Sequence, residues 1–222
     1  MKFLFDLDGT LTMKETLPVI AEHFGIEEQI IPLTQQTVQG IVPFEEGFMK
    51  RVHILRQYSV SEISRLLSTV PIHPLLLQFI RQERANCIVV SGNLDCWCHS
   101  LLEKIDCKHY YCSEALVKDD KLVGIQRLLN KKAIVCTYQE QGEKVAFIGD
   151  GHNDLEAMQQ ADLALVCGLS NTPAPSLLSV ADQVFYDEKE LVDYLDQLKD
   201  ISILSSRGKQ RPKVSVVSPK SD

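Results

Sequence analysis

Two aspartates separated by a single residue follow the first apolar segment of the chain. The segment Asp6-Leu7-Asp8-Gly9-Thr10 comes directly after Lys2-Phe3-Leu4-Phe5. Carboxylates at this spacing can lie on the same side of a turn, where one attacks an electrophile and the other transfers a proton. Aspartate is also a common turn residue, so the pair needs support from other segments.

Two further polar segments follow apolar segments in the same way. Ser91-Gly92-Asn93 follows residues 87–90, and the sequence GDGHND at 149–154 follows residues 145–148. Continuous apolar runs of this length are typical of strands that are covered on both faces, as in a parallel sheet. Since ligands bind beyond the carboxyl ends of such strands, the pattern predicts one site built from all three segments.

The residue types of this site indicate phosphate chemistry. Clustered carboxylates repel one another unless a cation joins them, and hard oxygen ligands favour Mg²⁺. Ser91 and the backbone N–H groups after it precede an expected helix, which is a natural anion site. Lys131 or Lys132, before another helical pattern, can add positive charge. Asp6 as nucleophile and Asp8 as general acid and base then describe phosphoryl transfer through an aspartyl-phosphate.

The elements that must position these residues alternate between strands and helices. Expected strands at 2–5, 87–90, 145–148, 163–166 and 184–186 are separated by helical patterns at 94–105 and 154–161, and a hairpin with a KDDK turn is expected within 111–125. This alternation predicts an α/β fold with a doubly wound, mostly parallel sheet.

Residues 14–74 differ from the rest, because they show helical periodicity and no convincing strand. One helical pattern spans 17–24, another 44–55, and a short helix is expected to open at Ser61 and Glu62. We therefore expect a small helical cap at 14–74, inserted after the first strand into a core formed by 1–13 and 75–200. The composition shifts near residue 205 to Ser, Lys, Arg and Pro, so 201–222 is expected to be a disordered basic tail.

Composition excludes several classes of protein. The net charge of −7 argues against a general nucleic-acid binder, and the chain lacks an apolar run long enough to span a membrane. The 45% hydrophobic content argues against a disordered chain. Seven cysteines without a C-x-x-C pair or a secretory signal favour reduced thiols and a cytoplasmic protein.

The motifs together resemble those of the haloacid dehalogenase superfamily of phosphohydrolases. DLDGTLT, SGN, a lysine and GDGHND occur in the order found in that superfamily, over roughly residues 1–195. The resemblance implies that Asp6 is the nucleophile and Asp8 the general acid and base, and that Ser91 and Lys131 hold the phosphate. Lys131 is preferred to Lys132 because apolar residues then follow at the family's spacing. The resemblance also implies that Asp6, the Asp8 backbone carbonyl, Asp150 and Asp154 form the Mg²⁺ site. Asn153 would line the site.

Within the superfamily, the chain is similar to phosphoserine phosphatases. That subgroup has a small helical cap after the first motif, with a glutamate for the substrate's amino group and an arginine for its carboxylate. Glu15 and Arg51 occupy these positions, Phe44 would form an apolar wall, and Gly92 would contact the substrate. The planar fork of arginine can bind both oxygens of a carboxylate. Two departures concern the substrate: SGN replaces a pair of glycines, and Gly9 stands where a serine is common.

The expected function is Mg²⁺-dependent hydrolysis of a small carboxylated phosphate ester, with L-phosphoserine as first choice. Phosphohomoserine or a sulfur-salvage intermediate are alternative substrates, and a phosphotransferase or a non-enzymatic phosphoacceptor switch are alternative functions. A dinucleotide-binding module is disfavoured, because no G-x-G-x-x-G follows the first strand. We expect a small-molecule partner, no nucleic acid and no membrane, and a monomer or homodimer.

Overall fold

The computed structural model describes the backbone of residues 1–207 and the side chains of 1–199. Its strands are β1 (Lys2–Phe5), β2 (Cys87–Leu94), β3 (His109–Lys118), β4 (Lys121–Arg127), β5 (Val145–Gly149), β6 (Leu163–Cys167) and β7 (Gln183–Phe185). Its helices are α1 (Thr16–Phe24), α2 (Glu27–Val38), α3 (Phe44–Leu55), α4 (Val60–Leu67), α5 (Pro74–Gln82), α6 (Asp95–Ile105), α7 (Lys131–Glu140), α8 (Leu155–Gln160), α9 (Pro175–Leu178) and α10 (Glu188–Arg207), with a short 3-10 helix η1 (His152–Asp154).

The strands form one sheet in the order β4-β3-β2-β1-β5-β6-β7. All neighbouring strands are parallel except the β3–β4 hairpin, which is antiparallel. β1 lies between β2 and β5, so the strand order reverses around it and the first polar segment follows a central strand. The predicted α/β fold with a doubly wound, mostly parallel sheet is confirmed.

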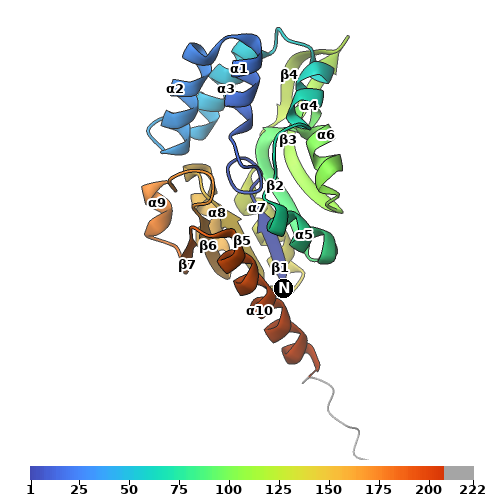
Figure 1. Cartoon of the computed structure of the whole chain (residues 1–222), viewed down its shortest axis with the longest axis vertical. Helices are drawn as coiled ribbons and strands as arrows, with labels where there is room; N and C mark the ends of the chain where they lie inside the picture. The colour runs from blue at the N-terminus through green and yellow to red at the C-terminus, as the bar shows by residue number, and fades with distance from the viewer. Residues whose placement is uncertain (208–222) are drawn as a thin grey trace, which may run out of the picture.

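Helices cover both faces of the sheet (Figure 1). On one face, Phe3 and Phe5 of β1 belong to a buried cluster that includes residues of α5, α6 and α10. On the other face, Leu4 of β1 belongs to a second cluster, which includes residues of α7, α8 and α9. A strand buried on both faces needs apolar residues at consecutive positions, which explains the continuous apolar run from Phe3 to Phe5.

Helices α1–α4, here called the helical insertion, lie between β1 and α5 in the chain. In Figure 1, α1, α2 and α3 stand together beyond one edge of the sheet, and α4 lies beside α6. The two segments that join the helical insertion to the sheet run side by side, through an antiparallel bridge between Thr12 and Ile72. The backbone N–H of Met13 donates to the Pro71 carbonyl, and that of His73 donates to the Leu11 carbonyl.

Four local details differ from the sequence-based expectation. β2 continues through Ser91-Gly92-Asn93 to Leu94, because the polar residues there keep extended backbone and are fully buried. Helix α2 was not predicted, since its polar composition and internal Pro32 hide the periodicity. The short helix begins at Val60 and not at Ser61, because Ser59 is its N-cap. Residues 201–207, expected to be disordered, form the last turns of α10; residues 208–222 of the expected tail lie outside the described residues.

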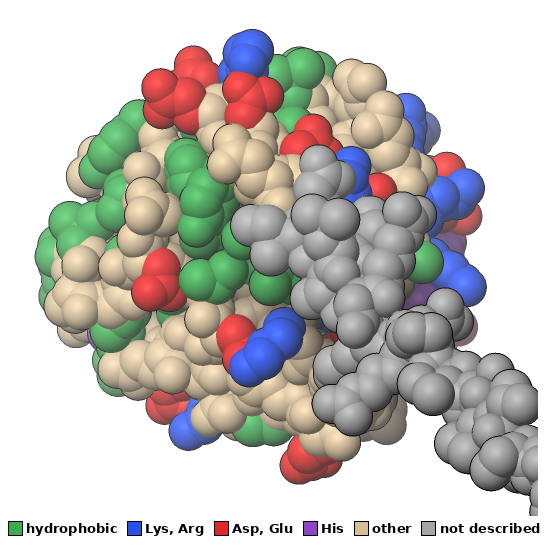
Figure 2. Space-filling view, turned by 90° about the horizontal axis from the view of Figure 1, so that it is seen from below, with side chains coloured by type: hydrophobic (Ala, Val, Ile, Leu, Met, Phe, Trp, Pro, Cys, Tyr) green, Lys and Arg blue, Asp and Glu red, His purple; other side chains and the backbone are tan. Residues whose placement is uncertain are grey.

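The face opposite the helical insertion mixes acidic, basic and hydrophobic side chains (Figure 2). This mixture is ordinary for a solvated protein surface. Among the described residues, no helix combines the length and the hydropathy that a membrane span requires.

Replacing the N-cap residue of α4 should lower stability measurably. The Ser59 hydroxyl accepts from the Glu62 N–H and also hydrogen-bonds Asp120 in the β3–β4 turn. We expect Ser59→Ala to lower the free energy of unfolding by about 1 kcal/mol, measured by urea denaturation. Ser68→Ala is the control, because its hydroxyl meets only a carbonyl of its own helix, that of Arg65. Equal effects of the two substitutions would contradict the capping role of Ser59.

Candidate active site

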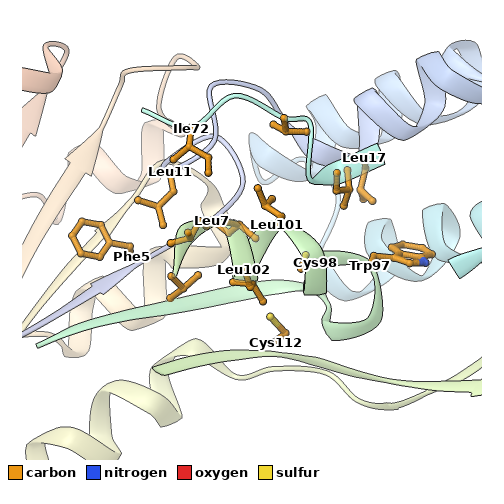
Figure 3. Packing of buried hydrophobic residues seen from close by; sticks show 14 of the residues in the cluster. Phe5, Leu7, Leu11, Leu17, Ile72, Trp97, Cys98, Leu101, Leu102 and Cys112 are labelled. Carbon is orange, nitrogen blue, oxygen red and sulfur yellow. The ribbon is translucent and has the colours of Figure 1, made fainter. Parts of the chain in front are cut away.

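The first motif is anchored by its apolar residues and presents its polar residues to the sheet edge. Leu7 and Leu11 are fully buried in the core, near Leu101 and Leu102 of α6 (Figure 3). Asp6 continues β1, and its N–H donates to the Ile148 carbonyl of β5 at 2.9 Å. The alternation of leucine with aspartate and threonine therefore directs one set of side chains into the core and leaves the other set for the site.

Three buried carboxylates converge at this edge. Asp6, Asp150 and Asp154 each place an oxygen within 4.8 Å of the others. Lys131, at the start of α7, places Nζ 2.6 Å from Oδ1 of Asp6 and 2.6 Å from Oδ1 of Asp154. Lys132, the alternative lysine, is exposed. The structure thus brings Lys131, and not Lys132, to the acidic cluster.

Burial and mutual repulsion govern the ionisation of this cluster. Burial raises the pKa of Asp6 well above its usual range, and the nearby Asp154 carboxylate raises it further. Burial and Asp154 also raise the pKa of Asp150, to about 7. Burial tends to lower the pKa of Lys131, but the carboxylates of Asp154 and Asp6 outweigh it, so the net shift is upward and the ammonium is favoured.

The donor set fits a hard divalent cation. Three buried carboxylates share one ammonium, so the cluster keeps an excess of negative charge away from water. Burying unbalanced charge is costly, and carboxylate oxygens are the ligands that small hard cations prefer. These residues can therefore hold a metal ion. The Asp8 carboxylate is not part of this group; its expected metal contact through the backbone carbonyl stays a prediction.

The Asp8 carboxylate connects the first motif to the helical insertion. One oxygen, Oδ1, accepts from the backbone N–H of Thr16 at 3.2 Å and from the Thr16 hydroxyl. The other, Oδ2, accepts from the Ser91 hydroxyl at 3.2 Å. Asn93 completes the arrangement, because its Nδ2 donates to Oγ1 of Thr16 at 2.8 Å. Asp8 is thus oriented by residues of β2 and by the first turn of α1.

The Asp150 carboxylate is held at both oxygens. Oδ1 accepts from the Thr10 hydroxyl at 2.9 Å, and Oδ2 accepts from Nδ2 of Asn171 at 3.2 Å. Nδ2 of Asn171 also donates to Oε1 of Glu15 at 3.0 Å. Asn171 lies in the loop after β6, at the carboxyl end of a parallel strand. The strand-end rule that selected the other segments could have found it, but a lone asparagine has no motif to mark it.

A small cavity of about 50 Å³ joins the acidic cluster to the helical insertion. Its lining combines residues from the strand ends with residues from α1, α2 and α3. It includes the sequence-predicted site residues Asp6, Asp8, Glu15, Phe44, Arg51, Gly92, Asp150 and Asn153. Ser91, Lys131 and Asp154 are not among the lining residues but contact lining residues directly, Ser91 through Asp8, Lys131 through Asp6 and Asp154 through the backbone N–H of Asp150.

The two charged residues expected in the helical insertion both line this cavity, Arg51 buried and Glu15 half-buried. Burial raises the pKa of Glu15 well above its usual range, and the neighbouring carboxylates of Asp150 and Asp8 add to the shift. Burial lowers the pKa of Arg51 to about 10, although Glu15 opposes the shift. The Arg51 side chain is 4% exposed; Nε donates to the Gly47 carbonyl and one terminal N–H to Oγ1 of Thr34. Arg51 also lines the cavity.

Aromatic rings close the cavity beside the second motif. Phe44 and Phe48 are stacked, with ring centroids 5.4 Å apart. The Phe44 ring lies directly over Gly92, so that a Cβ at that position would collide with it. The absence of a side chain at Gly92 therefore allows the helical insertion to approach β2 closely.

Fold and site together define an α/β protein with a buried acidic cluster that could hold a cation. The family model described as haloacid dehalogenase-like hydrolase matches residues 3–159. The chain belongs to this family, and the prediction of an enzyme that resembles its members is confirmed.

Phosphoserine phosphatases are among the proteins that this chain is similar to. The chain is 25% identical to the phosphoserine phosphatase of Methanocaldococcus jannaschii, in an alignment that covers 88% of this chain and 96% of that protein. It is 26% identical to the phosphoserine phosphatase of Saccharomyces cerevisiae, in an alignment that covers 73% of this chain and 57% of that protein. A solved structure described as a phospho-aspartyl intermediate analogue of phosphoserine phosphatase superposes with a TM-score of 0.75 at 26% identity, covering 86% of this chain and 97% of that one. The expected likeness to this subgroup is confirmed.

Adding a methyl group at Gly9 should disrupt the site by crowding. Gly9 has a φ of +75°, and an added Cβ would lie 2.5 Å from Oδ2 of Asp150, 2.6 Å from Nδ2 of Asn171 and 2.7 Å from Oε1 of Glu15. We expect Gly9→Ala to lower the free energy of unfolding by roughly 1–3 kcal/mol beyond the cost of the left-handed backbone.

Gly25→Ala isolates that backbone cost. Gly25 has a φ of +68°, and no atom lies within 4 Å of an added Cβ. Urea denaturation of both variants measures the difference. Equal losses of stability would show that crowding at Gly9 has no energetic consequence.

Proposed function

We propose that this chain is a Mg²⁺-dependent phosphomonoesterase that converts L-phosphoserine to L-serine and phosphate through an aspartyl-phosphate. The observation that supports it is the cavity shared by the acidic cluster and the helical insertion. Asp6 and Asp8 line one end, whereas Glu15 and Arg51 line the same cavity from the insertion. One small ester with phosphate, ammonium and carboxylate groups could meet all of these residues at once.

In the first half-reaction, a carboxylate oxygen of Asp6 attacks the phosphorus. The P–O bond to the serine oxygen breaks, and Asp8 gives its proton to that oxygen, so that neutral serine leaves. Hydrogen bonds from the N–H and hydroxyl of Thr16 to the Asp8 carboxylate keep it beside the leaving group. The proposed product of this step is a phosphorylated Asp6.

In the second half-reaction, Asp8 removes a proton from a water molecule. The resulting oxygen attacks the phosphorus, the bond to Asp6 breaks, and phosphate leaves, which regenerates both aspartates. Using the same group as acid and then as base requires it to stay near both the leaving oxygen and the incoming water. The hydrogen bonds from the Thr16 N–H and hydroxyl to Oδ1 of Asp8 meet that need.

Charge balance assigns the remaining residues. Mg²⁺, when bound by Asp6, Asp150, Asp154 and the Asp8 carbonyl, would offset the charge of the phosphoryl oxygens. Lys131 would add a second positive charge to the phosphoryl group, with the Gly92 N–H as a neutral donor. The Ser91 hydroxyl has a single proton, so it would donate to the phosphoryl group after turning away from Asp8, which Thr16 would still hold. The ammonium of Lys131 already contacts Asp6, the proposed nucleophile, at 2.6 Å.

Glu15 and Arg51 would select the serine moiety. A buried glutamate can pair with an ammonium, and the arginine fork with a carboxylate. Phe44 would form the apolar wall, and Asn153 would line the phosphate end. One departure from the subgroup pattern is Asn93, in the second motif. Its amide donates a hydrogen bond to the Thr16 hydroxyl, and Thr16 in turn hydrogen-bonds the Asp8 carboxylate.

Substitution of the nucleophile should abolish phosphate release. We expect the native protein with Mg²⁺ to release phosphate selectively from L-phosphoserine in a panel with phosphohomoserine, phosphothreonine and sugar phosphates. Asp6→Asn should be inactive because an amide is a poor nucleophile. Arg51→Ala should raise the KM for L-phosphoserine by roughly 10-fold or more, the usual cost of losing a hydrogen bond to a charged group.

Adjacent lysines provide the matched control. Lys131→Ala should lose at least about 100-fold in kcat because a buried charge is removed from the site, whereas Lys132→Ala should change kcat by less than about twofold because Lys132 is exposed.

The substrate panel also separates the alternative functions. Turnover of a different ester would support the aspartyl-phosphate chemistry but exclude L-phosphoserine as the substrate. Transfer of phosphate to an added alcohol in place of water would support the phosphotransferase, and a phospho-protein that persists without turnover would support the switch.

Cation binding should weaken at low pH. The pKa of Asp150 is raised to about 7 by burial and by Asp154. In the cation-free protein this carboxyl group therefore lowers the stability of the fold progressively as the pH rises from ~4 to ~7, and the loss is complete above pH ~7. A cation reverses this effect by binding the ionised form, with protons competing. The rise in melting temperature caused by Mg²⁺ should therefore be larger near pH 8 than near pH 6, as measured by differential scanning fluorimetry.

The variant Asp150→Asn provides the control for this measurement. Its Mg²⁺-induced rise should be small at both values of pH, because the titrating ligand is gone. A rise in the native protein that does not depend on pH would contradict the assignment of Asp150 as a ligand.

A further inference from the structure

Asn171 is placed to connect two parts of the site that the motifs leave separate. It lies in the loop between β6 and α9, and this loop is tied to the core at its far end by the Ala174 N–H, which donates to the Asp150 carbonyl at 2.9 Å. The single nitrogen Nδ2 donates to Oε1 of Glu15 at 3.0 Å and to Oδ2 of Asp150 at 3.2 Å. An amide has two N–H groups, so each carboxylate can receive one of them.

This bridge addresses a problem of like charge. Glu15 is half-buried close to Asp150 and Asp8, so ionised Glu15 is repelled within the site. Glu15 also lines a second, larger groove of about 930 Å³ between α1, α2 and the β6–α9 loop. Repulsion and hydration both favour rotation of the carboxylate away from the cavity and into that groove. The hydrogen bond from Asn171 opposes this rotation.

We propose that Asn171 is a positioning residue that determines specificity: its amide holds the Glu15 carboxylate in the cavity, where it can meet the ammonium group of an amino-bearing phosphate ester. The inference rests on the proposed function, because it assumes that Glu15 binds the substrate's ammonium. Asn171 itself need not touch the substrate.

The main chain at Gly9 makes room for this bridge. The amide nitrogen of Asn171 and both carboxylate oxygens surround the space that a side chain at position 9 would fill. A serine there, as is common in the subgroup that the chain resembles, would compete with Asn171 for the same volume. The glycine in the first motif and the asparagine after β6 are therefore structurally linked.

Three phosphate esters separate the contributions of the amino and carboxylate groups. L-Phosphoserine carries both groups, O-phosphoethanolamine carries only the ammonium, and 3-phosphonooxypropionate carries only the carboxylate. The value of kcat/KM is measured with Mg²⁺ for each ester, in the full-length native protein and in Asn171→Ala. The readout is the ratio of kcat/KM for L-phosphoserine to that for 3-phosphonooxypropionate, which does not depend on the fraction of active protein.

We expect Asn171→Ala to reduce this ratio by roughly 10-fold, the usual cost of losing a hydrogen bond to a charged group. The activity toward O-phosphoethanolamine should fall in parallel with that toward L-phosphoserine. Asn171→Ser retains one shorter donor, so its ratio should lie between those of the native protein and Asn171→Ala. This second variant also serves if the alanine variant is insoluble.

Ser170→Ala is the matched control. Ser170 lies in the same loop, but its hydroxyl donates to the Thr12 carbonyl and contacts Nε2 of His73, away from Glu15. Removal of the Ser170 hydroxyl should change kcat/KM by the same factor for all three esters and so leave the ratio unchanged. A change of the ratio in Ser170→Ala as large as in Asn171→Ala would show a general effect of the loop and would overturn the inference.

The native protein distinguishes failure of this inference from failure of the proposed function. If the native protein prefers L-phosphoserine to 3-phosphonooxypropionate and Asn171→Ala keeps that preference, only the role of Asn171 is overturned. If the native protein shows no preference between them, the ammonium-binding role of Glu15 and the proposed substrate fail first, and the inference fails with them.

Discussion

The arrangement of the site depends on how buried negative charge is balanced at the carboxyl end of β1. Three carboxylates have oxygens within 4.8 Å of one another, and one lysine contacts two of them. Such a cluster is unfavourable in a cation-free fold, and the raised pKa values of Asp6 and Asp150 reflect this. The same imbalance would give affinity for a cation, and a cation beside a lysine would attract phosphate. The feature that opposes folding is thus the one that would favour binding.

The sheet can hold this cluster because its strands are buried on both faces. β1 carries apolar side chains into two separate cores, and Leu7 and Leu11 extend the packing beyond the end of the strand. The turn that contains Asp6 and Asp8 is therefore rigidly supported, although its polar residues repel their neighbours. Glycines at positions 9 and 92 let other elements approach this turn, as the Asn171 amide and the Phe44 ring show.

Prediction from the sequence was most successful where polar residues that can do chemistry directly follow a segment with a clear hydrophobic pattern. Strands with continuous apolar runs and the polar segments that follow them were predictable, and so was the convergence of Asp6, Asp150 and Asp154. Lys131 could not be separated from Lys132 by residue type, because only the packing of α7 decides which lysine faces the cluster. Helix α2 escaped prediction because Pro32 and a polar composition obscure its pattern. Asn171 escaped because its role depends on a contact between distant segments.

The helical insertion and the first motif are connected through the Asp8 carboxylate. This carboxylate accepts hydrogen bonds from the first turn of α1 and from Ser91 on β2. Displacement of α1 from the sheet would break the bonds to Thr16, leave Ser91 as the donor, and alter the surroundings of the proposed acid and base. Glu15, which directly precedes α1, would move with it and lose the Asn171 contact. Proton transfer and recognition of the ammonium group would therefore both require α1 to be seated against the sheet. This requirement would explain why Glu15, proposed to bind the ammonium group, directly precedes the helix whose N-terminal turn hydrogen-bonds Asp8.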